Sequence, residues 1–214
     1  MTPRRSDKST RPESECIVTH MPRKRATLST SEARRDAVVD AAIAEFAHTG
    51  YHGTPISNVA SLAGISQAYV FKLFPGKITL FVAALDRCFE LVENALSAGA
   101  ARVDGAEPEK ILHAMGGAYA ELISDNRLLM LQVHAQSAAD IPEIAEALRR
   151  GFARVTRFAK KRSGAEDGQV QRFIAYGQLC HLITTLDIDG DDGDWAAILN
   201  LGIRHPNRPG TRKT

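Results

Sequence analysis

Apolar residues recur at helical spacing in one segment after another from Ser31 onward, and this periodicity limits the possible folds more than any other feature of the chain. No segment shows the strict apolar and polar alternation of a half-buried strand. No unit of about 20 to 50 residues repeats, so a solenoid is not expected. The sequence therefore predicts an all-α protein.

The composition is that of a globular protein. The chain has 214 residues, of which 44% are hydrophobic, and this is enough to bury a core. No stretch approaches the roughly 18 to 20 apolar residues that a bilayer span requires, and the N-terminus lacks the apolar region of a secretion signal. We therefore expect a cytoplasmic protein with no membrane partner.

The sequence contains no signature of a cofactor site or of catalysis. The three cysteines, Cys16, Cys88 and Cys180, are far apart and form no C-x-x-C pair, which argues against disulfides and zinc. Cys88 and Cys180 are expected to be small core residues. There is no P-loop, nucleotide-binding glycine fingerprint, G-x-S-x-G or H-E-x-x-H motif. We therefore expect no cofactor and no enzymatic activity.

Both ends of the chain are basic, although the net charge is only +2. Residues 1–30 are polar and show no periodicity, so they are predicted to form a disordered basic arm, and residues 204–214 a basic tail. These tails are either solvated ends or flexible arms that add contacts to phosphates. Met21 is a candidate for the true start of translation, and the sequence leaves this open.

Two short helices joined by a glycine turn are predicted after a first helix that starts at Ser31 and stops at Gly50. In "GTPISNVASLAGIS", Thr54 is expected to cap the first short helix, with Pro55 as its first residue. Gly64 supplies the left-handed turn. Ser66 is expected to cap the second short helix. This arrangement is a helix-turn-helix.

The second short helix has an apolar and a polar face. Val70 and Phe74 fall on its inner side, while a small, aromatic and basic set falls on the outer side, as in a helix that enters the DNA major groove. The alternative is that the outer residues are merely exposed. Phosphate contacts are expected from the ends of the neighbouring helices. The predicted DNA-binding residues are Thr54, Ser66, Gln67, Ala68, Tyr69, Lys72 and Lys77.

Residues 31–85 resemble the N-terminal DNA-binding domain of the TetR family of bacterial transcriptional regulators. In that pattern a threonine and a helix with V/I-A lead to A-G-V/I-S, a short recognition helix ending in an aromatic residue, and a lysine that opens a long helix. This chain departs from the pattern at Phe71 and Leu73, where polar residues are common. The matching residues are Thr54, Val59, Ala60, Ala63, Gly64, Ile65, Ser66, Phe74 and Lys77.

The resemblance implies a helix-turn-helix domain joined by a long helix to a helical domain that binds an effector and forms a homodimer. It also implies double-stranded DNA with a palindromic operator as the partner, and a small apolar molecule that releases a repressor. The alternative is a helical protein-binding adaptor that keeps the helix-turn-helix as a scaffold. The expected parts are the arm 1–30, the DNA-binding domain 31–77, the effector and dimerisation domain 78–203 and the tail 204–214.

The effector site is expected among the middle helices, where polar side chains stand in apolar surroundings. The candidates are Met115, Tyr119, Gln132, His134, Gln136, Phe152 and Phe158. No metal site is expected, because His113, His134 and His181 are not paired at ligand spacing. The acidic segment from Asp187 to Asp194 does not fit a calcium loop, and it is expected to connect to a last short helix that Asp194 caps.

Overall fold

The computed structural model describes the backbone of residues 24–202 and the side chains of residues 31–202. All regular elements in this part of the chain are helical, which confirms the all-α prediction. The helices are α1 (Lys24–Gly53), α2 (Ile56–Leu62), α3 (Gln67–Leu73), α4 (Lys77–Ala101), α5 (Pro108–Leu122), η1 (Ile123–Asp125), α6 (Arg127–Ser137), α7 (Pro142–Ser163), α8 (Asp167–Leu186), η2 (Ile188–Gly190) and α9 (Asp194–Asn200).

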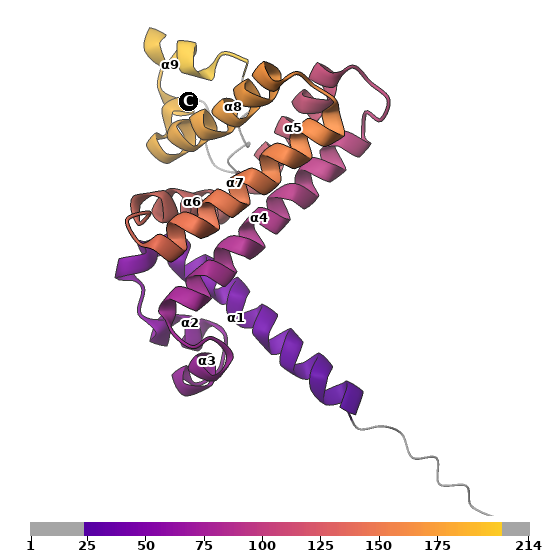
Figure 1. Ribbon diagram of the computed structural model, residues 1–214. Helices are drawn as coiled ribbons and strands as arrows, with labels where there is room; N and C mark the ends of the chain where they lie inside the picture. The colour runs from indigo at the N-terminus through magenta and orange to yellow at the C-terminus, as the bar shows by residue number, and fades with distance from the viewer. Residues whose placement is uncertain (1–23, 203–214) are drawn as a thin grey trace, which may run out of the picture.

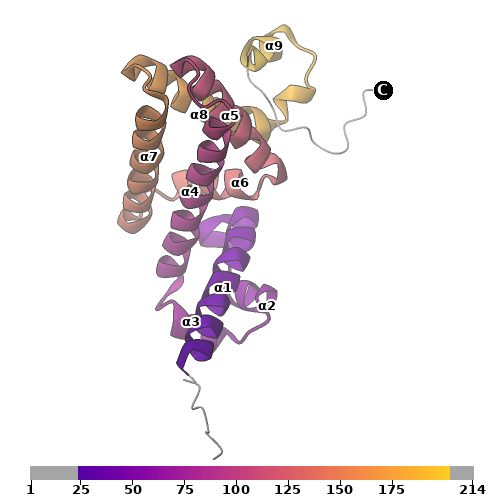
Figure 2. The same cartoon turned by 90° about the vertical axis from the view of Figure 1, so that its right-hand side faces the viewer.

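The helices α1 to α3 form one end of the molecule, and α8 and α9 lie toward the other (Figures 1 and 2). The long helix α4 runs between the two ends and packs mainly against α5 and α7. The helix α6 packs against α1, so the body of the molecule also touches the N-terminal helices through a second route.

The first helix starts earlier than the sequence predicts. It begins at Lys24 rather than Ser31, because the residues before Ser31 include good helix formers that extend the helix backward. The helix is kinked at Gly50, where φ is 72°, and its last turn continues to Gly53. The helix therefore includes residues 24–30 of the predicted arm 1–30, while residues 1–23 and 203–214 lie outside the described part.

Aromatic contacts tie α4 to the helices on both sides of it. Phe46 of α1 and Phe81 of α4 pack edge to face, with ring centroids 4.8 Å apart. Phe89 of α4 meets Phe152 of α7 at 5.4 Å. The residue Gly151 allows this close approach, since a Cβ atom there would lie 2.1 Å from the Phe89 ring. One continuous core therefore extends from the N-terminal helices into the body.

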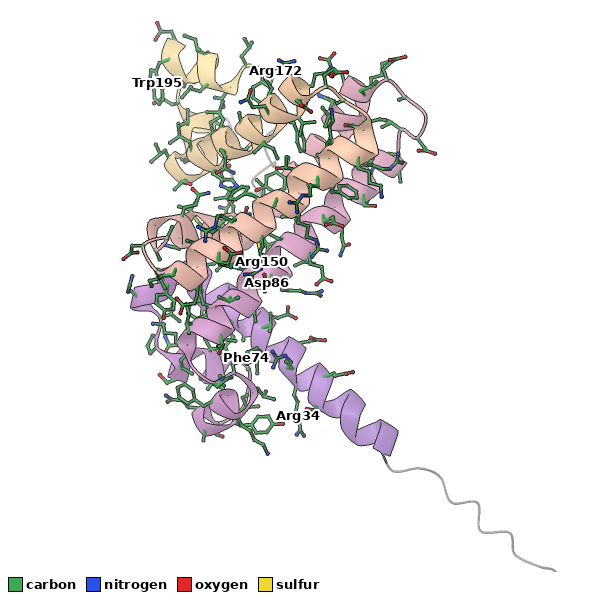
Figure 3. All side chains as sticks on the ribbon, viewed as in Figure 1. Arg34, Phe74, Asp86, Arg150, Arg172 and Trp195 are labelled. Carbon is green, nitrogen blue, oxygen red and sulfur yellow. The ribbon has the colours of Figure 1, made fainter. Side chains whose placement is uncertain are left out.

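Ion pairs on the surface fix the register of α7 along α4. Arg150 bonds to Asp86 at 3.2 Å (Figure 3), and Arg154 pairs with Glu93 further along. These side chains are mostly exposed, so each pair contributes at most about 1 kcal/mol.

Across residues 24–202, no single helix has the length and apolar character of a membrane span. The helices α3 and α4 reach that length and apolar character only when they are taken together, and the chain bends by 68° between them.

The thiols of Cys88 and Cys180 are free and buried, as expected for core residues. Burial raises the pKa of the Cys88 thiol to about 12 and that of Cys180 to about 11. Both thiols therefore remain protonated and unreactive near neutral pH. Cys16 lies outside the described residues.

Candidate DNA interface and effector cavity

The turn between α2 and α3 has the predicted geometry. Gly64 adopts φ of 67°, and the amide of Ile65 donates to the carbonyl of Ala60 at 3.0 Å. The hydroxyl of Ser66 then accepts a hydrogen bond from the amide of Tyr69 at 3.2 Å. Ser66 therefore caps α3 and fixes its first turn, as the sequence predicted.

The predicted role of Thr54 is wrong. Pro55 is the N-cap residue of α2, and no side chain caps that helix. Thr54 is fully buried, and its hydroxyl lies 2.7 Å from the carbonyl oxygen of Gly50 and 2.6 Å from the hydroxyl of Thr49. The side chain closes the kinked end of α1, because the carbonyl groups freed by the kink need a donor. It is therefore not available to a phosphate.

The two faces of α3 separate as predicted. Val70 and Phe74 are each only 1% exposed and anchor the helix in the core. Phe71 is 42% exposed on the flank, and Tyr69 is half-buried. The short helix therefore contributes few residues to the core and presents a polar outer side. The exposed polar or small residues on that side are Gln67, Ala68 and Lys72.

Two arginines of α1, which the sequence analysis did not single out, hold α3 in place. The guanidinium of Arg35 donates to the carbonyl of Leu73 at 2.8 Å and lies 4.0 Å from the centroid of the Phe74 ring. Arg34 lies 5.9 Å from the centroid of the Tyr69 ring. Arg34 and Phe74 are labelled in Figure 3, on α1 and at the end of α3. The only sequence signal was the Arg-Arg pair on the polar side of the first helix.

Lys77 turns inward rather than outward. Its ammonium donates to the carbonyl of His52 at 3.3 Å and lies 5.1 Å from the centroid of the Tyr51 ring. Partial burial lowers the pKa of this ammonium. Lys77 therefore ties the start of α4 to the end of α1.

A cavity of about 240 Å³ lies in the body of the molecule, between α4, α5, α7 and α8. Its wall is largely apolar, and the principal apolar residues are Phe89, Val92, Leu96, Leu112, Phe152, Val155, Phe173 and Ile174. Tyr119 and Gln132 add polar groups at the buried end. The polar residues near the surface are Glu109, His113, Gln169, Arg172 and Gln178.

Three of the seven predicted effector residues line this cavity: Tyr119, Gln132 and Phe152. The other four do not, for different reasons. Met115 is fully buried in the core, and Phe158 packs against the same core. His134 lies against Gly50 of α1. Gln136 is exposed and donates to Gln178 at 2.9 Å.

The buried end of the cavity contains a hydrogen-bonded cluster. The hydroxyl of Tyr119 lies 2.6 Å from Nε2 of His181, and Nε2 of Gln132 donates to that hydroxyl at 3.4 Å. Desolvation lowers the pKa of His181 to about 4, so the imidazole is neutral at pH 7. Burial raises the pKa of Tyr119. The Nδ1 atom of His181 is buried and has no hydrogen-bond partner among the residues that the structure describes.

His181 is a buried core histidine. Within the described ranges, no three His, Cys, Asp or Glu side chains come together as a metal site would require. The acidic connection also differs from expectation in one detail. Gly193 is the N-cap residue of α9, and Asp194 is its first residue, whose carboxylate accepts from the amide of Trp195 at 2.8 Å.

Large apolar side chains remain exposed on α8 and in the segment that contains α9. Leu186 is 63% exposed, Ile198 is 72% exposed and Leu201 is 80% exposed. Tyr176, Leu182 and Trp195 are about half exposed; Trp195 is labelled in Figure 3. Such a concentration on one part of a molecule is typical of an interaction surface.

Comparison with known proteins gives a consistent result. Residues 38–84 match the family "Bacterial regulatory proteins, tetR family". The HTH-type transcriptional regulator RutR of Escherichia coli is 34% identical over 59 residues, which cover 28% of this chain and 28% of RutR. The match to RutR thus spans little more than a quarter of that protein's length. The HTH-type transcriptional repressor KstR of Mycolicibacterium smegmatis is 29% identical over 84% of this chain and 93% of its own.

Solved structures share the fold. A TetR-like transcriptional regulator from Rhodococcus sp. RHA1 has a TM-score of 0.58 and 18% identity, and covers 84% of this chain and 94% of its own. The transcriptional regulator FadR from Bacillus subtilis, in complex with stearoyl-CoA, has a TM-score of 0.60 and 16% identity. The match covers 77% of this chain and 93% of the FadR chain.

The sequence relatives are named as transcriptional regulators, in agreement with the prediction that the chain is not an enzyme. The family match covers α3, and the likeness to KstR extends over most of the body. Through these matches the chain resembles the TetR family of bacterial transcriptional regulators, most clearly over residues 38–84.

Proposed function

We propose that the protein is a dimeric repressor that binds a palindromic DNA operator and is released from it by a small apolar effector. The observation that carries this proposal is the polar outer face of α3, presented by a helix that is capped by Ser66 and held from α1 by Arg35. A groove-binding helix needs such a fixed orientation, because base contacts depend on hydrogen-bond geometry.

The exposed residues of α3 suit direct contact with base pairs and phosphates. Gln67 can form paired hydrogen bonds to adenine, and Ala68 can pack on a thymine methyl group. Lys72 supplies a positive charge for a phosphate or for guanine. Tyr69 is half-buried, and its hydroxyl would act at the edge of the contact. The proposed interface omits Thr54, and assigns Ser66 and Lys77 to positioning α3 and α4.

Dimerisation is proposed through α8 and α9. Their exposed apolar side chains, such as Leu186 and Ile198, would be covered by the same surface of a second copy related by a two-fold axis. Two recognition helices about 34 Å apart would then enter successive major grooves. Because the bacterial chromosome is the target, the working location would be the cytoplasm.

Two routes connect the cavity with the DNA-binding end. The helix α4 carries Phe89 in the cavity wall and Lys77 at the junction with α1. The helix α6 carries Gln132 in the cavity and His134 against the kink at Gly50. An effector that moves either helix would shift α1 to α3 and change the distance between the two recognition helices. Such coupling requires the effector to bind the two states with different affinity.

The competing function is a protein-binding adaptor that uses α3 only as a scaffold. Replacement of both Tyr69 and Lys72 by Ala separates the two, measured by fluorescence anisotropy on a site selected from random DNA. We expect the variant to lose at least tenfold in affinity. The matched control is Lys110→Ala, an exposed lysine on α5. Unchanged affinity of the double variant would favour the adaptor.

A further inference from the structure

Arg172 stands at the open end of the cavity. It lines the cavity from α8 and is exposed (Figure 3). Within the part of the chain that the structure describes, it forms no ion pair and no hydrogen bond. Its guanidinium can bind a carboxylate through two parallel hydrogen bonds.

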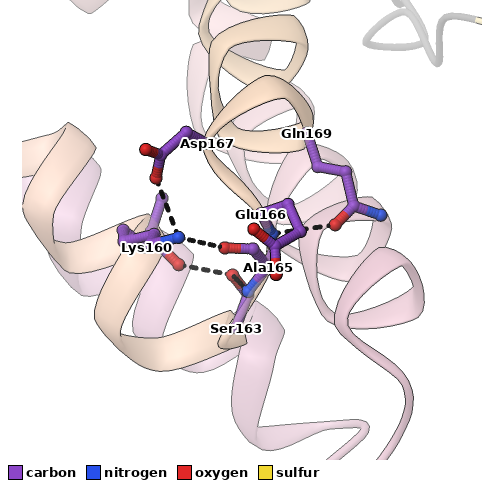
Figure 4. A network of polar contacts seen from close by, with 7 residues as sticks. Lys160, Ser163, Ala165, Glu166, Asp167 and Gln169 are labelled. Carbon is purple, nitrogen blue, oxygen red and sulfur yellow. Dashed lines mark hydrogen bonds and ion pairs between the residues drawn. The ribbon is translucent and has the colours of Figure 1, made fainter.

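Several polar contacts join the start of α8 to the end of α7, and this segment of α8 carries Arg172 beside the cavity. Lys160 of α7 bonds to the carbonyl of Ala165 at 2.7 Å and to the carboxylate of Asp167 at 2.8 Å (Figure 4). The side chain of Gln169 accepts from the amide of Glu166 at 2.9 Å and completes a capping box. Arg172 stands on the next turn of this segment.

The apolar wall beyond Arg172 limits the size of a ligand. An apolar cavity of about 150 Å³ holds one benzene molecule. On that scale, the volume of about 240 Å³ holds roughly nine or ten non-hydrogen atoms. A long acyl chain exceeds this volume, whereas a chain of about eight carbons or one substituted ring fits.

The buried end offers a second polar contact. Gln132 is only 3% exposed and lines the cavity. Its amide nitrogen is used within the protein, at 3.1 Å from the carbonyl of Leu128, while its Oε1 bonds to no residue that the structure describes. This free acceptor on a residue of the cavity wall favours a ligand with a donor at its far end.

We propose that the cavity binds an amphipathic monoanion of about ten non-hydrogen atoms, whose carboxylate pairs with Arg172 and whose apolar body lies between α4, α5, α7 and α8. A hydroxyl group at the far end would add a hydrogen bond to Gln132. This assignment rests on the proposed effector site and specifies the chemical class of its ligand.

Glu109 also lines the cavity, and its carboxylate would favour a cationic ligand. The case for an anion bound by Arg172 is the stronger of the two. The carboxylate of Glu109 stands in the first turn of α5, where it already interacts favourably with the positive end of the helix dipole. Arg172 lies in the N-terminal half of α8, where a positive charge has no such structural benefit. The neighbouring amides of Gln169 and Gln178 add donors on the same helix.

Calorimetric titration with octanoate, 1-octanol and octylamine tests the head group, because the three share one apolar chain. We expect octanoate to bind at least tenfold more tightly than the other two. Arg172→Gln should abolish this preference and leave 1-octanol unchanged, and Arg172→Lys should retain part of it. Arg157→Gln, an exposed arginine of α7 outside the cavity wall, is the matched control. Thermal denaturation checks that every variant is folded.

Two further measurements extend the test. 8-Hydroxyoctanoate should bind more tightly than octanoate to the wild type but not to Gln132→Leu, and stearate should bind more weakly than octanoate. Equal binding of the three head groups, or octanoate binding that survives Arg172→Gln, would overturn the proposal. Failure of octanoate to bind at millimolar concentration would overturn it too, and a gel shift that still shows DNA binding would leave the repressor function intact.

Discussion

Arg35 lies over the ring of Phe74, with its guanidinium carbon 4.0 Å from the ring centroid and its Nη1 atom 2.8 Å from the carbonyl oxygen of Leu73. One side chain of α1 thus both stacks on the residue that ends α3 and satisfies a carbonyl group at its C-terminus. The contact joins residues 38 positions apart in the sequence. It sets the angle at which α3 is presented.

Arg35→Met should lower DNA affinity by misplacing α3 and reduce the free energy of unfolding by about 1 to 3 kcal/mol. A positioning residue differs from a phosphate contact in its salt dependence. We expect the slope of log affinity against log salt to stay that of the wild type. A slope reduced by about one would show instead that Arg35 binds a phosphate directly.

Lys72 and Lys77 should behave differently although both are lysines near the recognition helix. Lys72 is exposed, so Lys72→Ala should reduce the salt slope of DNA binding by about one. The ammonium of Lys77 is bonded to His52, so Lys77→Ala should keep the slope and lower the melting temperature. Anisotropy titrations at several salt concentrations separate the two effects. Equal slope changes in both variants would contradict the positioning role of Lys77.

His181 should make the folded state less stable at low pH. Well above pH 6.5 the imidazole is neutral in both states and contributes no pH dependence. Below that value His181 becomes protonated in the unfolded chain. In the folded chain it stays neutral until about pH 4, where its folded-state pKa lies. Stability therefore falls in this window by up to about 1.4 kcal/mol per pH unit from this group.

The comparison of wild type with His181→Gln isolates this contribution, because all other groups titrate in both proteins. Urea unfolding at pH 7, 6 and 5 should show that the variant loses less stability than the wild type as the pH falls. Parallel curves for the two proteins would mean that the pKa of His181 is not lowered in the folded state.

Leu186→Glu and Ile198→Glu should convert the protein into a folded monomer. Both side chains are largely exposed in a single chain, so charge there costs little in folding but would be buried in the proposed dimer. Sedimentation velocity measures the change. Leu62→Glu, at an exposed leucine of α2, is the control and should leave the dimer intact. A wild type that sediments as a monomer at micromolar concentration would contradict the proposed interface.

Local features of the DNA-binding end could be predicted because they depend on neighbouring residues. The glycine turn at Gly64 and the cap at Ser66 act within a few positions, and the structure confirms both. Thr54 was misassigned because its hydroxyl serves the kinked end of α1 rather than α2. The contact between Arg35 and Leu73 depends on tertiary packing, which no local pattern indicates.

Only some of the predicted effector residues line the cavity, and the reason is geometric. Gln132, His134 and Gln136 stand on one helix at intervals of two and four residues, and residues two apart point to different sides. Gln132 therefore faces the cavity, whereas His134 meets Gly50. Arg172 carries no sequence signal, since its role depends on four helices that come together only in the fold.

The contact between α3 and base pairs is tested most directly by comparing the DNA sequences that the wild type and Gln67→Ala select from a random pool. The wild type should select a palindrome whose half-sites lie one helical turn apart. The variant should bind the same palindrome but lose its preference at one symmetric pair of positions, with a discrimination loss of about 1 to 3 kcal/mol. Identical preferences at every position in the two proteins would contradict the assignment of α3 as the recognition helix.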